Sequence, residues 1–468
     1  MITTSEDCRI EFSQGTLTVR SPSKSIIDKI FPKQFLIFDQ RDSLWRSDAM
    51  HYGKIIKILS ESDIRFEDLV PKWELVKWPV VNIHSLRADQ LEAKQSWLRN
   101  RNGVLIMPTG TGKTEVALSI MSELACSSLV VSPIRDLMYQ WHTRILKGLG
   151  YDAGIIGDNT FDVRNVSVTT YDSACIHMDK LGDKFKLIIF DECHHLPGEI
   201  RRDAARMSAA PYRLGLTATP ERSDMKHLDL EGLIGPITYI MPIAEAKGSI
   251  LADYDINRVA VRLSQEEQKK YNELSKLVRD YVLKRRKDDH AFEWEDLCAA
   301  SGKDPEARKA QKAFYEKKSI ENKAGEKFRV LEDLFRLHPR EKVIVFAGSN
   351  PMAMEISKRF LIPCILNQCG KKERREIIDG FRDGTYHAIV ANQILDEGVD
   401  IPEAKVAVIM GGNASTRQAK QRLGRILRKS GNIRAMLYEV VCKDTNETTR
   451  SIKRRKSDAY KTTRHIRI

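Results

Sequence analysis

The 468-residue sequence lacks a long apolar run, a leader pattern and paired cysteines. No stretch of about eighteen consecutive apolar residues occurs, which excludes a conventional membrane-spanning helix. The N-terminus has no basic segment followed by an apolar one, so a secretory leader is not expected. The eight cysteines are scattered without paired spacing, which excludes a disulfide framework and favours a reducing compartment. We therefore expect a soluble, intracellular protein of the cytoplasm or nucleoid.

The spacing of metal ligands is also missing. Cys193, His194 and His195 are adjacent, but no C-x-x-C or H-x-x-x-H partner lies nearby. A zinc site needs ligands spaced so that four groups converge on one point. A zinc site is therefore not expected here.

Positive charge is abundant. The formal net charge is +13, which favours a polyanionic partner such as nucleic acid over a merely solvated surface. Two basic blocks, Lys284–Lys287 and Lys453–Lys456, could follow a phosphate backbone, with Arg285 and Arg286 as candidate DNA contacts. Hydrophobic residues make up 42% of the chain, which is enough for cores in about three domains.

A glycine-rich loop follows the apolar run from Gly103 to Met107 and leads into an amphipathic helical pattern. The glycines let the backbone approach a triphosphate closely, and the N-terminus of the next helix favours negative charge. Lys113, which we expect to be exposed in an empty cleft, would reach the β- and γ-phosphates, and Thr114 would bind magnesium. The sequence therefore predicts that ATP and Mg²⁺ bind here. The predicted nucleotide-binding residues of the loop are Thr109, Gly110, Thr111, Gly112, Lys113 and Thr114.

A second apolar run, Leu187–Phe190, ends in two acidic residues. The carboxyl ends of parallel strands are where open α/β sheets place their ligands. We expect Asp191 to hold Mg²⁺ and Glu192 to polarise the attacking water. The alternative is that both acids only solubilise the end of a strand.

Two series of strand-like runs alternate with helical patterns, and only the first contains a phosphate loop. The expected fold class is α/β, with two parallel-sheet lobes in tandem, a small N-terminal α+β domain and a charged helical insert. The expected ranges are 1–80 for the N-terminal domain, 81–255 for the first lobe, 262–322 for the insert and 323–468 for the second lobe with its basic tail.

The second lobe carries residues that could complete a nucleotide site from across a cleft. Arg425 and Arg428 are about one helical turn apart, so both could face the γ-phosphate and neutralise charge in the transition state. Gly398 permits close backbone approach, and Asp400 can bond a ribose hydroxyl. The alternative for the two arginines is a basic helix exposed to solvent.

The order of these motifs resembles that of superfamily-2 DNA helicases and translocases, most closely the XPB repair-helicase family in its short archaeal form. The resemblance spans Leu86 to Arg428 and implies that the two lobes are RecA-like. Arg87 and Gln90 resemble the Q-type motif that reads adenine, and Asp191–His194 matches the D-E-x-H box. Thr217–Thr219 resembles the motif that couples hydrolysis to movement. Three segments look like strand-gripping motifs: Ser132–Arg135, Thr169–Tyr171 and Phe346–Asn350. Their candidate DNA contacts are Arg135, Thr170, Ser349 and Asn350.

The resemblance extends to the flanking segments. Arg65–Asp68 resembles the end of the small domain proposed in XPB-like proteins to sense DNA distortion, and the insert resembles the family's thumb. The run Pro220–Asp224 falls where the family has an R-E-D element, which makes Arg222 and Asp224 candidate DNA contacts. Ser223 stands where that element has glutamate, so its strand-separating role does not transfer directly.

The resemblance implies an ATP hydrolase that steps along one strand of DNA, 3′ to 5′, and opens or remodels the duplex in DNA repair or transcription. Single-stranded or forked DNA is the implied partner, and a nuclease or a repair or transcription factor is a candidate protein partner. Three alternatives stay open: an RNA-stimulated helicase, the motor of a restriction system, and a nucleotide-switched clamp that binds DNA without productive unwinding. The lack of a nuclease motif argues against the second.

Overall fold

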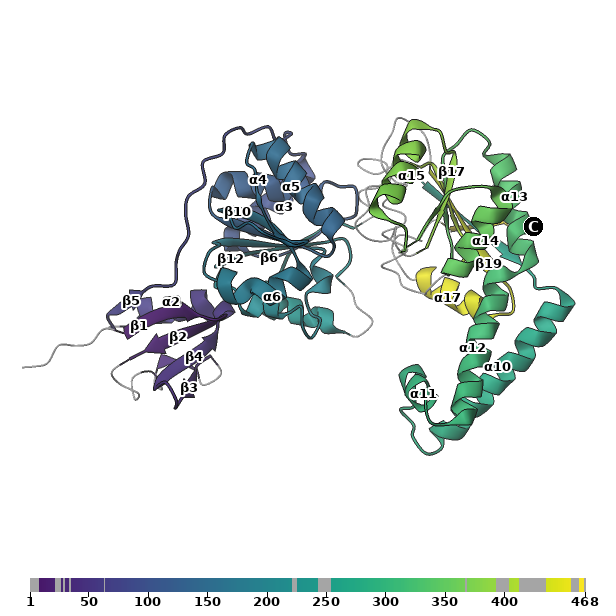
Figure 1. The fold of residues 1–468 in the computed structure, drawn as a ribbon, viewed down its shortest axis with the longest axis horizontal. Helices are drawn as coiled ribbons and strands as arrows, with labels where there is room; N and C mark the ends of the chain where they lie inside the picture. Colours follow the sequence, from purple (N-terminus) through teal and green to yellow (C-terminus); the bar gives the residue numbers. More distant parts are fainter. Residues whose placement is uncertain are drawn as a thin grey trace, which may run out of the picture. The chain divides into compact units, whose positions relative to one another are not determined.

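The computed structural model of the protein consists of two compact units, Met1–Pro242 and Ile243–Ile468. It describes residues 8–21, 27, 30–32, 35–62, 64–220, 225–242, 254–366, 368–392, 404–411, 435–455 and 463–466. Each unit contains a largely parallel sheet with helices packed on it, so the expected α/β class is confirmed (Figure 1). Within the described ranges, no helix is both long and apolar enough to cross a membrane.

The N-terminal domain is a five-stranded sheet with one main helix. Its strands are β1 Cys8–Ser13, β2 Thr16–Arg20, β3 Ile37–Asp39, β4 Leu44–Asp48 and β5 Phe66–Asp68, in the order β3-β4-β2-β1-β5. Helix α2, Tyr52–Ser60, buries Tyr52, Ile55 and Leu59, because residues three and four positions apart share one helix face. These side chains form the core of the domain together with Ile10, Leu17 and Trp45.

The N-terminal domain packs against the first lobe through charged and apolar contacts. Arg206 donates two hydrogen bonds to the carboxylate of Asp48, at 2.9 and 3.1 Å. Lys72, after the last strand of the domain, pairs with the buried carboxylate of Asp183. Gly15 adopts φ +82°, and a Cβ there would lie 2.2 Å from the Met207 side chain. A side chain at position 15 would therefore disturb this contact.

The first lobe is an eight-stranded sheet in the order β13-β6-β12-β11-β7-β10-β8-β9. Every pair in it is parallel except β8 with β9. Helices α3, α4 and α5 cover one face and α6 covers the other (Figure 1). The strands are β6 Asn102–Ile106, β7 Ser128–Ser132, β8 Gly154–Gly157, β9 Thr160–Phe161, β10 Val166–Thr170, β11 Leu187–Asp191, β12 Tyr212–Thr217 and β13 Ile237–Ile240. The helices are α3 Ala88–Asn100, α4 Lys113–Leu124, α5 Arg135–Leu149, α6 Tyr171–Leu181, α7 Asp203–Arg206 and α8 Leu230–Leu233.

The second unit is built on a seven-stranded parallel sheet in the order β16-β17-β15-β18-β19-β14-β20. Its strands are β14 Tyr254–Val261, β15 Val343–Phe346, β16 Cys364–Ile365, β17 Ala388–Ala391, β18 Val406–Ile409, β19 Ala435–Cys442 and β20 Thr463–Ile466. Its helices outside the insert are α13 Gly325–Leu337, α14 Asn350–Phe360, α15 Lys371–Asp383 and α17 Asn446–Arg455. Strand β14 pairs along its whole length with β19. Residues 254 and 255, expected in the first lobe, therefore belong to the second sheet.

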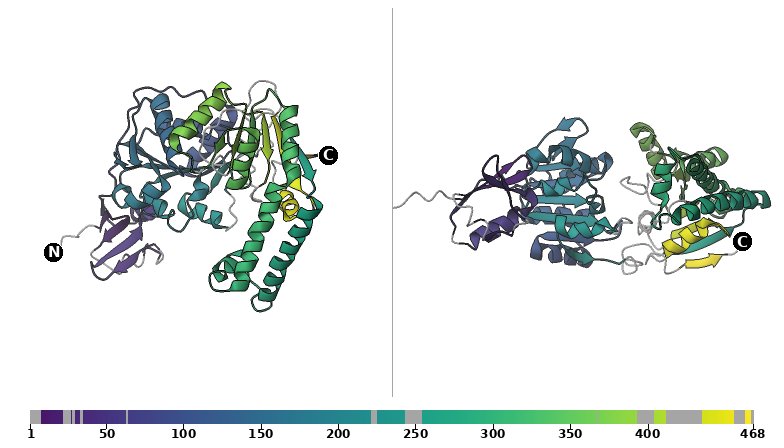
Figure 2. Two further views of the ribbon diagram at one scale, coloured as in Figure 1. Left: turned by 45° about the vertical axis from the view of Figure 1, so that its right-hand side comes forward. Right: turned by 90° about the horizontal axis from the view of Figure 1, so that it is seen from below.

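The expected helical insert follows β14 and consists of α10 Gln265–Arg286, α11 Trp294–Ala300 and α12 Pro305–Lys323. The two long helices lie side by side and extend away from the sheet of the second unit (Figures 1 and 2). Helix α10 begins with a capping box in which Ser264 and Glu267 satisfy each other's backbone N–H groups. Tyr281, Phe292 and Leu297 form the small core at the far end of the insert.

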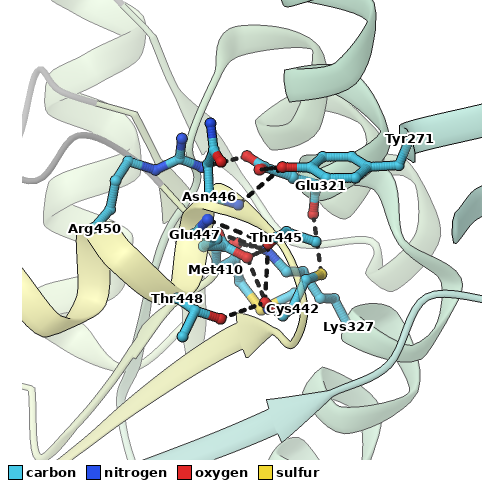
Figure 3. Close-up of polar contacts among 10 residues, drawn as sticks. All are labelled: Tyr271, Glu321, Lys327, Met410, Cys442, Thr445, Asn446, Glu447, Thr448 and Arg450. Atoms are coloured by element: carbon cyan, nitrogen blue, oxygen red, sulfur yellow. Dashed lines mark hydrogen bonds and ion pairs between the residues drawn. The ribbon is translucent and has the colours of Figure 1, made fainter. Parts of the chain in front are cut away.

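A buried polar network joins the base of the insert to the second sheet (Figure 3). The ammonium of Lys327, on α13, donates 2.8 Å hydrogen bonds to the Met410 carbonyl and to Glu447, and both charged side chains are at most 1% exposed. Glu447 also accepts the Cys442 N–H at 2.9 Å. Beside this pair, Glu321 of α12 accepts hydrogen bonds from Tyr271 of α10 and from Arg450 of α17. Both long helices of the insert are thus joined to α17 through the carboxylate of Glu321.

Candidate nucleotide site

The phosphate loop joins β6 to α4 in the first lobe. The Met107 N–H donates to the Thr217 carbonyl at 2.9 Å, which ties the loop to the end of β12. Gly110 and Gly112 adopt φ +87° and +84°, a conformation that favours glycine. A Cβ on Gly112 would also lie 2.3 Å from Gln90 Nε2. The N-terminal turn of α4, which includes Thr114, therefore opens onto a loop whose backbone favours glycine at these two positions.

Lys113 is less accessible than expected. Its side chain is 10% exposed, and its ammonium lies 3.2 Å from the Met107 carbonyl and 3.8 Å from Glu192 Oε1. The expectation of an exposed lysine is therefore wrong, because a loop carbonyl and a carboxylate hold the cation against the sheet. Thr111, in the same loop, is buried and donates its hydroxyl to the Pro108 carbonyl at 2.7 Å. Thr109 is partly buried.

Gln90 and Arg87 bind the phosphate loop from the start of α3. Gln90 is 4% exposed, and its amide nitrogen donates to the Thr111 carbonyl at 2.9 Å while its oxygen accepts the Arg87 N–H at 3.1 Å. The guanidinium of Arg87 donates to the same Thr111 carbonyl at 2.7 Å and pairs with Asp89. The same nitrogen also makes a long, 3.5 Å contact with the Gly112 carbonyl. Gln90 thus serves the loop itself, and adenine recognition by it stays a prediction.

Asp191 and Glu192 lie at the carboxyl end of β11, next to the loop. Asp191 is buried, and its two carboxylate oxygens accept hydrogen bonds from Trp141 Nε1 at 2.8 Å and from the Glu192 N–H at 3.0 Å. Burial raises the pKa of the Asp191 carboxyl and the charge of Glu192 raises it further, whereas the Trp141 hydrogen bond and Lys113 lower it. A cation bound beside this carboxylate would favour its charged form.

Glu192 occupies an uncommon backbone conformation, with φ 46° and ψ 53°. Its Oε2 atom is buried and makes no hydrogen bond within the described part of the chain, although His194 Nδ1 lies 3.5 Å away. His194 Nδ1 is also 3.0 Å from the hydroxyl of Thr217, which donates to the Thr219 carbonyl at 3.1 Å. The D-E-x-H residues and the Thr217–Thr219 motif are therefore in contact through His194.

The candidate DNA contacts of the first lobe lie at helix starts. Arg135 is the first residue of α5 and pairs with Asp158, which follows β8. Thr170 is the N-cap of α6, where its hydroxyl accepts the Ser173 N–H. Arg135 follows β7 and Thr170 ends β10, so both lie at the same edge of the sheet as the phosphate loop, since β6, β7 and β10 run parallel in one sheet.

The candidates of the second unit are also at helix starts or in the insert. Ser349 is the N-cap of α14, and Asn350 accepts a 2.7 Å hydrogen bond from Asn392 at the end of β17. In the insert, Arg285 pairs with Asp304, and Arg286 donates to the Phe292 carbonyl at 3.1 Å. Both guanidinium groups thus have partners within the insert, and DNA contact by them stays a prediction.

Several predicted site residues lie outside the described residues. They are Arg222, Ser223, Asp224, Gly398, Asp400, Arg425 and Arg428. In the described part of the chain, no cluster of three or more His, Cys, Asp or Glu side chains is arranged to hold a metal ion. A Mg²⁺ ion commonly takes one or two carboxylates and the substrate phosphates instead.

Two contacts with Asp191 were not predicted from the sequence. Trp141 bonds the Asp191 carboxylate, and the Tyr171 hydroxyl donates to the Asp191 backbone carbonyl at 3.0 Å. Neither contact has a local sequence signal, because each joins a helix to a strand end many residues away. Only the order of β7, β10 and β11 in the sheet brings them together.

Comparison with known proteins assigns the family. Three family models match in order along the chain: the Xeroderma pigmentosum group B helicase damage recognition domain over residues 10–70, the Type III restriction enzyme res subunit over 83–222, and the ERCC3/RAD25/XPB C-terminal helicase over 308–458. The DNA 3'-5' translocase XPB2 of Sulfurisphaera tokodaii is 42% identical over 409 residues, which cover 87% of this chain and 92% of the relative. This chain belongs to the XPB helicase family.

A more distant relative of this XPB-family chain is longer, and a solved structure shares its fold at low sequence identity. The general transcription and DNA repair factor IIH helicase/translocase subunit XPB of Dictyostelium discoideum is 27% identical over 424 residues, covering 85% of this chain. The chain spans only 48% of that relative. The structure of Saccharomyces cerevisiae Dbp5 bound to RNA and ADP BeF3 aligns with a TM-score of 0.55 at 15% identity, covering 81% of this chain and 89% of that one. This likeness confirms the expected helicase fold.

Proposed function

We propose that this XPB-family chain is an ATP hydrolase that moves 3′ to 5′ along DNA and opens or remodels the duplex. One observation carries the chemistry: Lys113 and Glu192 approach to 3.8 Å at the carboxyl ends of β6 and β11, with Asp191 beside them. All three side chains are largely buried. In a site of low polarity the Lys113 cation acts strongly on a polyanionic substrate, and the two carboxylates are available for a metal ion and for a proton of the attacking water.

Each residue of the site has a distinct task in hydrolysis. The N–H groups of the loop and the N-terminus of α4 bind the phosphates, and Lys113 supplies the fixed cation. The buried Oε2 atom of Glu192, which makes no hydrogen bond within the described part of the chain, can accept a proton from the attacking water. From the sequence, Arg425 and Arg428 sense the γ-phosphate, and Gly398 and Asp400 contact the ribose end of the nucleotide.

The residues beside the loop also suit Mg²⁺. The Thr114 hydroxyl and the Asp191 carboxylate are oxygen ligands of the type that Mg²⁺ prefers. When bound, Mg²⁺ neutralises charge on the β- and γ-phosphates. Trp141 and the Glu192 N–H orient the carboxylate of Asp191 before any ion arrives.

Contacts with the DNA backbone suit a motor, because binding without sequence preference makes every step alike. Arg135 and Thr170 are the proposed contacts of the first lobe, and Ser349 and Asn350 are those of the second. The direction and the DNA substrate rest on the relatives, which include a DNA 3'-5' translocase and a subunit of a transcription and repair factor. A nuclease or a repair or transcription factor is the proposed protein partner.

A parallel ATPase assay tests this function. The full chain is assayed with single-stranded DNA, duplex DNA and RNA, and single-stranded DNA should stimulate hydrolysis most. Glu192→Gln should bind ATP normally but lower kcat by about 10² to 10⁴. Greater stimulation by RNA would make the chain an RNA helicase. A chain that moves along duplex DNA should displace the third strand of a triplex substrate. If DNA stimulates hydrolysis but no third strand is displaced, the chain is a nucleotide-switched clamp.

A further inference from the structure

Two buried aromatic side chains converge on Asp191 from different helices. Trp141, on α5, donates its indole N–H to Asp191 Oδ2 at 2.8 Å, and Tyr171, on α6, donates its hydroxyl to the Asp191 carbonyl at 3.0 Å. Trp141 is 2% exposed and Tyr171 is fully buried. Both hydrogen bonds are therefore protected from competing water. One bond acts on the carboxylate and the other on the backbone.

These bonds flank Glu192, a residue with a strained backbone. Glu192 adopts φ 46°, in the left-handed region, which costs a non-glycine residue stability and persists where the surroundings hold it. The carbonyl of the 191–192 peptide accepts from Tyr171, and the N–H of the same peptide donates to Asp191 Oδ1 at 3.0 Å. On the other side, the Glu192 carbonyl accepts the His195 N–H at 3.0 Å. The direction of the Glu192 side chain is thus set by bonds on both flanking peptides.

The donors belong to the helices that begin at the candidate DNA contacts. Arg135 is the first residue of α5, and Trp141 lies about 9 Å further along the same helix, since each residue advances it by about 1.5 Å. Thr170 is the N-cap of α6, and Tyr171 is the next residue. A small shift of either helix therefore moves a hydrogen-bond donor relative to Asp191.

We propose that Trp141 and Tyr171 are positioning residues for ATP hydrolysis, through which the helices that begin at Arg135 and Thr170 set the orientation of Asp191 and Glu192. The inference rests on the proposed function for the identity of the reaction. A DNA strand bound at the starts of α5 and α6 acts on hydrolysis through these two donors. Trp141 aims the carboxylate on the metal side of the site, and Tyr171 aims the base that activates water.

Isosteric variants of the full chain test the proposal. Trp141→Phe and Tyr171→Phe each remove one donor and keep an aromatic ring. For each variant, kcat and KM for ATP are measured with and without single-stranded DNA, and the affinity for a fluorescent ADP analogue is measured with Mg²⁺ and with EDTA. Trp97→Phe is the matched control, because Trp97 is also buried in the first lobe and its Nε1 donates to the Arg213 carbonyl at 3.1 Å, near the start of β12.

The two variants should differ in a defined way. Trp141→Phe loses a bond to a charged group and should lower DNA-stimulated kcat about tenfold, whereas Tyr171→Phe should lower it roughly two- to tenfold. Trp141→Phe should weaken ADP binding only in the presence of Mg²⁺, and Tyr171→Phe should leave ADP affinity and KM unchanged. A purely structural role would reduce the folded fraction and leave kcat per folded molecule unchanged, as expected for Trp97→Phe.

Two results separate failure of this proposal from failure of the proposed function. If DNA stimulates the unmodified chain but both variants keep its kcat and its stimulation ratio, the positioning role is wrong. If DNA does not stimulate the unmodified chain, the proposed function is wrong. In that case the positioning role is judged from kcat without DNA. A lower kcat in both variants supports the role, and an unchanged kcat contradicts it.

Discussion

Removal of the Lys327 ammonium should destabilise the second unit more than any change at its surface. In Lys327→Met, the carboxylate of Glu447 stays buried without its counter-charge, and the Met410 carbonyl loses its 2.8 Å hydrogen bond. Breaking a buried pair by deleting one partner costs about 3–5 kcal/mol, because it leaves an uncompensated charge in a dry environment. We expect Lys327→Met to lower the free energy of unfolding of this unit by that amount.

A double variant isolates the charge from the packing. Lys327→Met combined with Glu447→Gln removes both charges, and the glutamine oxygen can still accept the Cys442 N–H. The double variant should therefore be more stable than Lys327→Met alone, by about 2 kcal/mol or more, because replacing both members of a buried pair is often nearly neutral. Arg329→Gln on the same helix is the control, since its exposed pair with Glu326 should contribute less than about 1 kcal/mol.

Urea denaturation of the intact chain measures these differences in stability. Hydrogen exchange of peptides from β19 and α17 shows which transition belongs to the second unit. Exchange is needed because a protein of two units need not unfold in one step. A single variant Lys327→Met as stable as Arg329→Gln would refute the reasoning. So would a double variant less stable than the single one, because the loss could not then arise from the unpaired carboxylate.

Three further predictions concern the nucleotide site and the insert. Lys113→Ala should abolish ATP hydrolysis while the chain stays folded, as checked by ATPase and thermal unfolding; normal turnover would exclude the phosphate-loop role. Gly112→Ala should weaken ATP binding strongly in a nucleotide titration, because φ +84° and the 2.3 Å approach of Gln90 Nε2 leave no room for a methyl group; unchanged affinity would show that the loop can rearrange. Neutralising Lys284, Arg285 and Arg286 together should flatten the salt dependence of DNA binding by about two units of slope, because each phosphate contact on a single strand contributes about 0.7. A change of less than about one unit would show that these residues serve only the contacts they make within the insert.

The phosphate loop and the acidic strand end could be predicted because both are local patterns. Position 112 favours glycine because the loop backbone has a positive φ there, and Asp191 ends a continuous apolar strand. The accessibility of Lys113 could not be predicted in the same way. Its burial depends on the Met107 carbonyl and on Glu192, which the fold brings from another strand. A residue's partners across a sheet leave no trace in its immediate sequence.

The sheet to which β14 belongs could not be predicted from the sequence for a related reason. Strand β14 directly precedes the insert, and only its pairing with β19 assigns it to the second sheet. The network around Lys327 was also missed, because a lysine in a helix is ordinarily exposed and its partners are distant in sequence. The family, in contrast, was evident from the order of motifs, and the comparisons confirm it.

The position of β14 in the sheet has a consequence for synthesis of the chain. Its principal partner, β19, leaves the ribosome on the order of 180 residues later, a delay of roughly 10 to 35 seconds at ordinary elongation rates. During that interval β14, with the apolar side chains of Ile256, Val259 and Val261, lacks both of its sheet partners, because β20 is translated later still. The nascent chain therefore carries an unpaired strand edge for longer than a small domain takes to fold. We expect folding of the second unit to wait for translation of β19, and chaperone binding during synthesis to concentrate on this segment.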